Sequence, residues 1–188
     1  MTKRWVIAAV AAVGAGVMAV PLLLGGGEGT TATGPAMMAS HRTGGTCKLE
    51  GKPKLEAFTV RDMNGAEVRL ADYTGKAILL NYWATWCGPC KVEIPAFVEL
   101  YDQYKDQGLV ILGVSTDDDP ETLRAYAKDM KMNYPVLVGR DNEPLLEAFG
   151  PVWGLPTSYF IGRDGAVCGK HMGPATKEQF EQEIKALL

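Results

Sequence analysis

The sequence predicts one α/β domain in which helices flank a mixed central sheet, and three observations support this. Residues 76–84 and 109–115 are nearly continuous apolar runs, the pattern of strands that are covered on both faces. A segment with helical spacing follows each run. A hairpin and an amphipathic helix close the chain, which indicates that antiparallel strands join the parallel ones.

Two hairpins are predicted from turn dipeptides between apolar segments. The first joins residues 55–60 to 66–70 through Asn64-Gly65, and the second joins residues 157–161 to 166–172 through Asp164-Gly165. Residues 136–138 form a short apolar run and indicate a minor strand.

Helical spacing predicts four helices. They cover residues 87–107, 120–130, 143–149 and 176–188. Gly108 ends the first helix, and Pro95 inside it is expected to kink it. Asp119 is the expected N-cap of the second helix, with Pro120 in its first turn. We attribute the neighbouring Asp117 and Asp118 to loop solvation rather than to a metal site.

The composition excludes a nucleic-acid-binding protein and bounds the size of the core. The 188 residues include 19 Lys+Arg and 22 Asp+Glu, with a formal net charge of −3, so there is no basic excess for phosphates. Residues 5–24 carry no charge, and residues 25–45 are rich in glycine. About 140 residues remain, which is enough for one sizeable core.

Residues 5–24 are expected to be a transmembrane anchor, because roughly 20 apolar residues cross a bilayer. Lys3 and Arg4 precede the run, so residues 1–4 are placed in the cytoplasm and the rest of the chain outside. A cleaved signal peptide is the main alternative, although this run is longer than a signal-peptide core. A buried helix of a soluble domain is disfavoured by the glycines and the proline of the run.

The Gly/Thr-rich residues 25–46 have no hydrophobic period and are interpreted as a flexible tether. The folded domain then covers residues 47–188.

Cys87-Gly88-Pro89-Cys90 lies where a central strand passes into a helix, and this predicts a redox-active pair. At a helix N-terminus, free N–H groups and the helix dipole stabilise the thiolate of Cys87, which we expect to be the accessible nucleophile. Cys90, one turn on and more buried, can resolve a mixed disulfide. A zinc half-site is disfavoured because no second C-x-x-C or His pair accompanies the motif. An inert disulfide remains the other alternative.

The residues WATWCGPC, Pro95 five residues later and GLPTSYFIGRDG together resemble thioredoxin. More narrowly, the chain is similar to the membrane-anchored TlpA/ResA/CcmG group of thiol–disulfide oxidoreductases, with TlpA as the nearest match. The resemblance covers residues 55–188 and implies a thioredoxin fold with an N-terminal β-hairpin extension. It implies no cofactor and no metal.

The resemblance also assigns the surroundings of the cysteines. It implies that Pro156 is cis and faces the dithiol, and that the Leu155 backbone pairs with a client polypeptide. An ordinary trans turn at Pro156 is the alternative. The group's client-contacting positions fall on five residues: Trp86, Gly88, Pro89, Leu155 and Thr157. We expect Trp86 to pack around the site, Trp83 to be core, and Trp153 either to shape a groove beside Pro156 or to be core.

Glu93 matches the glutamate that this group carries three residues after its second cysteine. The resemblance implies that Glu93 accepts the proton of Cys90. The alternative is that it only complements the helix dipole. Thioredoxin has a buried aspartate where this chain has Asn81, which leaves Glu93 as the one obvious proton acceptor of the site.

Cys47 and Cys168 are expected to form a structural disulfide, because an oxidising compartment favours one and the TlpA-like pattern contains such a pair. Two free or accessory redox thiols are one alternative. A copper site of Cys168, His171 and Met172 is another, since soft ligands suit Cu(I).

The expected function is a reductase of extracytoplasmic protein disulfides, on a bacterial inner membrane with its domain in the periplasm. As the family implies, a membrane electron donor of the CcdA/DsbD type recharges it. Its clients are apocytochrome c or the proteins of copper delivery and oxidase assembly. A general disulfide oxidant or isomerase is one alternative. A copper chaperone of the Sco type is another, but it needs C-x-x-x-C, and a peroxidase needs a different cysteine environment.

Overall fold

Seven strands and four α-helices make up the described part of the chain, residues 58–188 of a computed structural model. In order, the elements are β1 (Thr59–Arg61), β2 (Glu67–Arg69), the 3-10 helix η2 (Leu70–Tyr73), β3 (Ala77–Trp83), α1 (Gly88–Tyr104), the 3-10 helix η3 (Lys105–Gln107), β4 (Leu109–Ser115), α2 (Pro120–Asp129), β5 (Val136–Val138), α3 (Glu143–Glu147), β6 (Thr157–Ile161), β7 (Val167–Met172) and α4 (Lys177–Leu187). The predicted anchor, the tether and Cys47 lie outside the described residues. Between residues 58 and 188, no helix is both long enough and apolar enough to cross a membrane.

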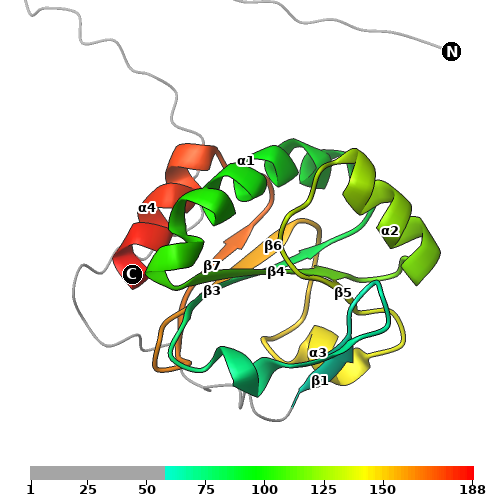
Figure 1. Ribbon diagram of the computed structural model, residues 1–188, viewed down its shortest axis with the longest axis horizontal. Helices are drawn as coiled ribbons and strands as arrows, with labels where there is room; N and C mark the ends of the chain where they lie inside the picture. The colour runs from blue at the N-terminus through cyan, green and yellow to red at the C-terminus, as the bar shows by residue number, and fades with distance from the viewer. Residues whose placement is uncertain (1–57) are drawn as a thin grey trace, which may run out of the picture. The chain divides into compact units, whose positions relative to one another are not determined.

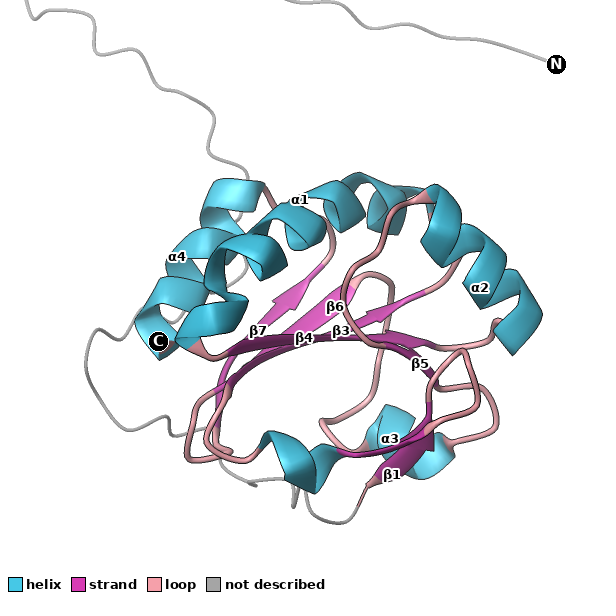
Figure 2. Cartoon of the chain, viewed as in Figure 1, coloured by secondary structure: helices cyan, strands magenta, loops and turns pink. Residues whose placement is uncertain are grey.

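The main sheet has the strand order β5-β4-β3-β6-β7. Strands β3, β4 and β5 are parallel, and β6 and β7 continue the sheet in antiparallel pairing. Helices α1, α2 and α4 cover one face, while α3 and the β1–β2 hairpin cover the other (Figures 1 and 2). The predicted mixed sheet between two layers is therefore confirmed.

The central strand β3 is buried at every position, as its apolar run predicts. Successive side chains of a strand point to opposite faces of the sheet. Leu80 and Tyr82 accordingly pack in the cluster that contains Leu145 of α3, and Leu79 packs with Phe97 of α1. Both faces of the sheet thus contribute to the core.

The predicted elements recur with small shifts of their ends. Residues 109–115 and 136–138 are strands β4 and β5, as predicted. The first helix continues through Pro95, and the chain leaves η3 at Gly108 with a φ of 98°. Asp119 is the N-cap of α2, as predicted, and accepts hydrogen bonds from two main-chain N–H groups.

The first predicted hairpin is present as β1 and β2, which pair antiparallel around a five-residue loop, residues 62–66. The carboxylate of Asp62 accepts hydrogen bonds from the N–H groups of Asn64 and Ala66, both at 2.8 Å. The N–H of Gly65 also donates to the carbonyl of Asp62 at 3.0 Å, so this side chain and the main chain together close the loop that contains Asn64-Gly65. The second predicted hairpin is present as β6 and β7.

Candidate active site

The Cys87–Cys90 pair lies at the carboxyl edge of the sheet, where β3 passes into α1. The N–H of Cys87 donates to the carbonyl of Ala84 at 3.2 Å, which turns the chain after the strand. Cys87 is the N-cap of α1, and its Sγ accepts a hydrogen bond from the N–H of Cys90 at 3.2 Å. The two residues form a disulfide. The prediction that the first sulfur lies at a helix N-terminus is confirmed.

Both cysteines are buried in this oxidised state: Cys90 is the more buried of the two, as predicted, but Cys87 is less accessible than expected. Cys87 is 4% exposed and Cys90 is 2% exposed. Because the disulfide holds the sulfurs together, both side chains lie in one apolar cluster with Ala84 and Ile94. What distinguishes them is the N–H group directed at Cys87, which favours its thiolate in the reduced protein.

Two aspartates after β4 hold the loop that precedes Cys87. Asp118 accepts hydrogen bonds from the N–H of Thr85 at 2.9 Å, its hydroxyl at 2.6 Å and the hydroxyl of Ser115 at 2.7 Å. Asp117 accepts one from the indole N–H of Trp86 at 2.8 Å. Sequence reasoning attributed both residues to loop solvation and missed this role. The two apolar runs could have indicated this role. They form the parallel neighbours β3 and β4, and the carboxyl ends of parallel neighbouring strands lie at the same edge of the sheet.

The three tryptophans near the site differ in exposure. Trp83 is 1% exposed, which confirms its core position, whereas Trp86 is 68% and Trp153 is 79% exposed. Trp86, next to Cys87, thus lies at the surface of the site rather than in its core, and its bond to Asp117 holds the ring there. Trp153 is also no core residue.

Glu93 lies on α1 one turn after Cys90 and is buried, at 2% exposed. Its Oε1 accepts a hydrogen bond from the N–H of Ala175 at 2.8 Å. Its Oε2 has no hydrogen-bond partner among the described residues. Burial raises the pKa of Glu93 from 4.5 to about 7, and the bond from Ala175 opposes this shift. A carboxyl with a pKa near neutrality can both accept and release a proton at physiological pH.

The Leu155–Pro156 peptide bond is cis, as the resemblance implies. The hydroxyl of Thr157 donates to the carbonyl of Gly154 at 2.7 Å, which closes the turn around this bond. The carbonyl of Pro156 accepts a hydrogen bond from the N–H of Gly173 at 2.9 Å. Thr157 is fully buried at the start of β6, so its expected contact with a client is not available to its side chain.

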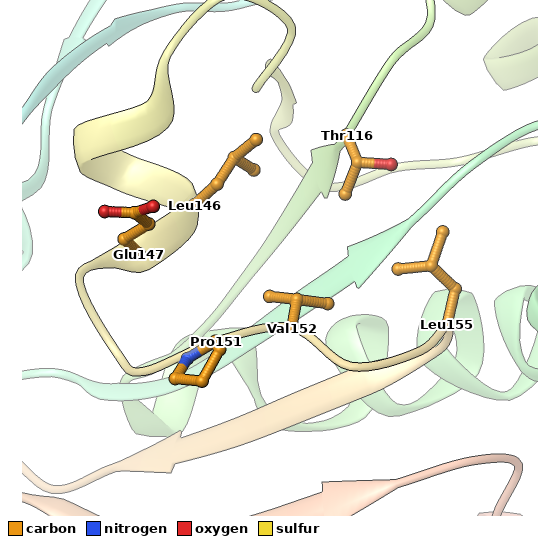
Figure 3. A pocket seen from close by; sticks show the side chains of 6 residues that line it. All are labelled: Thr116, Leu146, Glu147, Pro151, Val152 and Leu155. Atoms are coloured by element: carbon orange, nitrogen blue, oxygen red, sulfur yellow. The ribbon is translucent and has the colours of Figure 1, made fainter.

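A cavity of about 320 Å³ opens beside Leu155 (Figure 3). Its lining comes from α3, from the end of β4 and from the segment before β6: Leu146, Glu147, Thr116, Pro151, Val152 and Leu155. Leu146 lies on one side of the cavity, with Val152 and Leu155 on the other. The lining is mostly apolar and includes the residue before the cis proline. The cavity is therefore an apolar recess next to the cis peptide bond.

Asn81 occupies the strand position where thioredoxin has an aspartate. It is buried, and its amide donates to the hydroxyl of Ser158 on β6 at 3.0 Å. An amide does not titrate, so Asn81 links β3 to β6 and leaves proton transfer to another group.

The comparisons with known proteins agree with this geometry. The sequence matches the AhpC/TSA family over residues 52–169. It is 34% identical over 140 residues to thiol-disulfide oxidoreductase ResA of Bacillus thuringiensis subsp. konkukian, covering 74% of this chain and 80% of that protein.

The chain belongs to the AhpC/TSA family.

Solved structures of similar proteins share the fold of this AhpC/TSA family member. A thioredoxin-family thiol:disulfide interchange protein from Chlorobium tepidum TLS has a TM-score of 0.65 at 30% identity, covering 69% of this chain and 92% of that chain. The pneumococcal exposed lipoprotein thioredoxin from Streptococcus pneumoniae strain TIGR4 has a TM-score of 0.61 at 31% identity, covering 69% and 98%. The predicted thioredoxin fold is therefore confirmed.

As an AhpC/TSA family member with this disulfide, the chain is a thioredoxin-like thiol–disulfide oxidoreductase, and Cys87 and Cys90 are its redox pair. The similarity to ResA confirms the wider group that the motifs indicated. The narrower resemblance to TlpA stays a prediction.

Cys168 lies on β7, is half-buried and is disulfide-bonded. Its predicted partner, Cys47, lies outside the described residues. The pairing of Cys47 with Cys168 therefore stays a prediction.

Proposed function

We propose that this oxidoreductase reduces disulfides of extracytoplasmic client proteins, with Cys87 as nucleophile and Cys90 as resolving thiol. The observation that carries this proposal is the position of the pair: Cys87 caps α1, and Leu155, the residue before the cis proline, packs against the apolar cluster that contains both cysteines. A dithiol at this place has a stabilised thiolate to attack with and a second thiol in reach to release the product.

In the first step, the Cys87 thiolate of the reduced protein attacks one sulfur of a client disulfide. A bond forms between Cys87 Sγ and that sulfur, and the client's S–S bond breaks. The second client sulfur leaves as a thiolate and takes up a proton from water. The N–H of Cys90 and the N-terminus of α1 favour the attacking thiolate over the thiol.

In the second step, Cys90 transfers its proton to Glu93 and attacks Cys87 Sγ. The mixed disulfide breaks, the client leaves with both sulfurs reduced, and the protein is left with the Cys87–Cys90 disulfide. Glu93 is one helical turn from Cys90, and a pKa near 7 makes its carboxylate an effective proton acceptor at neutral pH.

The client is proposed to bind beside the cis proline. Its backbone extends the edge at Leu155, and an apolar side chain next to its cysteine enters the cavity between Leu146 and Val152 (Figure 3). The exposed rings of Trp86, next to Cys87, and of Trp153, two residues before Leu155, offer further apolar contact surface to the client.

Two electrons must return to the oxidised pair after each cycle. We propose a membrane dithiol donor of the CcdA/DsbD type, with residues 5–24 holding the domain at the outer surface of the inner membrane. The clients are haem-binding cysteines of apocytochrome c or thiols of copper-delivery and oxidase copper-site proteins. Alkaline extraction tests the anchor: the protein should stay with the membrane, and release into the wash would overturn the anchoring.

Trapping in the native membrane tests the function. Cys90→Ser removes the resolving thiol, so Cys87 should accumulate a mixed disulfide with its client, which mass spectrometry would identify. The double variant Cys87→Ser/Cys90→Ser is the control and should give no adduct. Absence of adducts on Cys87 would reject the assigned roles.

The reduction potential tests the direction of transfer. Gly88-Pro89 is the dipeptide of reducing thioredoxin, and we expect a potential close to thioredoxin's value of about −270 mV. Equilibration of the pair with glutathione buffers measures it. A value near about −120 mV, typical of a strong oxidant, would show that the protein oxidises its clients instead.

A further inference from the structure

The short segment between β7 and α4 has hydrogen bonds to both sides of the active site. The N–H of Gly173 donates to the carbonyl of Pro156 at 2.9 Å. Two residues later, the N–H of Ala175 donates to Oε1 of Glu93 at 2.8 Å. Residues 173–175 therefore connect the cis proline with the carboxyl that lies one turn from Cys90.

The local sequence explains why these two N–H groups are available. Gly173 turns the chain out of β7 with a φ of 85°, and Pro174 has no N–H to donate. Thr176 is the N-cap of α4 in a reciprocal capping box with Gln179, so its N–H is already bonded. The main-chain N–H of Ala175 therefore needs an acceptor, and the carboxylate of Glu93 is that acceptor.

The bond from Ala175 fixes the carboxyl of Glu93 in one orientation. Oε1 is bonded, while Oε2 is buried without a hydrogen-bond partner among residues 58–188. A buried polar atom in this condition is costly, so it calls for a functional reason. A proton from the neighbouring thiol would satisfy Oε2.

We propose that the main-chain N–H of Ala175 is a positioning group for thiol exchange: it orients Glu93 so that Oε2 can take the proton of Cys90. Through Gly173, the same segment ties that carboxyl to the cis-proline loop, where the client binds. This inference rests on the proposed function, because it assumes that Glu93 receives the proton of the resolving thiol.

The groups around Glu93 define the pH dependence that follows. Cys90 lies one turn before Glu93 on α1, and Tyr134, from the segment before β5, has a raised pKa owing first to burial and then to Glu93. On the α4 side, His171 packs against Phe180, and Lys177 pairs with Glu99. Because the bond from Ala175 lowers the pKa of Glu93, deleting it should raise that pKa further.

The test deletes this N–H without changing any charge. Ala175→Pro removes the donor, and Ala175→Gly is the matched control that keeps it. Reduced protein is mixed with 5,5′-dithiobis(2-nitrobenzoic acid) in a stopped-flow instrument between pH 5 and 9. Attack by Cys87 releases the first thionitrobenzoate, and attack by Cys90 on the mixed disulfide releases the second.

The expected result concerns the second release. Its pH midpoint should move up by about one unit in Ala175→Pro, the size expected when a charged acceptor loses one hydrogen bond. Ala175→Gly should keep the wild-type midpoint. In a Glu93→Gln background, Ala175→Pro should cause no further shift.

Three outcomes would overturn the inference. The first is an unchanged midpoint in Ala175→Pro while Glu93→Gln alters the profile, which rejects the role of Ala175 but not that of Glu93. The second is an equal shift with and without Glu93. The third is an unaltered profile in Glu93→Gln itself, which rejects the proposed proton acceptor as well. If Ala175→Pro does not fold, L-lactic acid at position 175 replaces the N–H by an ester oxygen and tests the same point.

Discussion

Glu93 has an unusual environment for a carboxyl group, since burial of a charge is costly unless partners compensate for it. One main-chain hydrogen bond is present, and no cation forms an ion pair with Glu93 within the described residues. The protonated form is therefore favoured in the folded protein, and the pKa of Glu93 rises to about 7.

This pKa leads to a prediction about stability. Between about pH 4.5 and 7, the unfolded chain releases the proton of Glu93 while the folded chain retains it, so the unfolded state binds fewer protons. The free energy of unfolding should therefore fall as pH rises through this window, by on the order of 3 kcal/mol from this group. Urea denaturation of the oxidised protein at several pH values measures it.

Glu93→Gln should lose this pH-dependent decrease, because an amide does not titrate. The exposed Glu67→Gln should keep the wild-type dependence. Parallel stability curves for wild type and Glu93→Gln would contradict the raised pKa.

At the scale of elements, the ends of β3 and β4 are joined by side chains as well as by strand pairing. The segment between β4 and α2 supplies Asp118, and the segment between β3 and α1 supplies Thr85, 33 positions away. The bonds between them hold the loop that leads into Cys87. Rigid placement of the nucleophile thus depends on a residue outside its own loop.

Asp118→Asn should weaken this connection, because an amide nitrogen cannot accept the hydrogen bonds that a carboxylate oxygen accepts. We expect the free energy of unfolding to fall by about 1–3 kcal/mol, measured by urea denaturation. The exposed Asp106→Asn is the control and should change it by less than about 0.5 kcal/mol. Equal effects of the two substitutions would show that Asp118 has no special role.

At the scale of the whole molecule, the proposed Cys47–Cys168 disulfide joins the start of the domain to β7. It would enclose 120 residues between its two cysteines. A crosslink of that length restricts the unfolded chain by at most about 4–5 kcal/mol.

Peptide mapping under non-reducing conditions should find a Cys47–Cys168 peptide. The variant Cys47→Ser/Cys168→Ser should lose up to about 4 kcal/mol of stability and keep the first release from 5,5′-dithiobis(2-nitrobenzoic acid), which depends on Cys87 alone. A pairing of Cys168 with any other cysteine would refute the prediction.

Most elements were predictable because their signals are local. Strands β3 and β4 follow from continuous apolar runs, and α2 from its aspartate cap with a proline in the first turn. The first hairpin follows from the Asn64-Gly65 dipeptide, but the bonds by which the Asp62 side chain closes its loop were not predicted.

For the site, the sequence by itself determined the redox pair, the cis proline and the family. These depend on residue types at short spacings, such as Cys87 and Cys90 three positions apart. The tertiary structure decided the environment of that pair: the bond between Ala175 and Glu93, 82 positions apart, and the bonds from Asp118 to Thr85. The reason is physical, since strand order determines which loops meet at the carboxyl edge of the sheet, and residues that far apart leave no local pattern to reveal it.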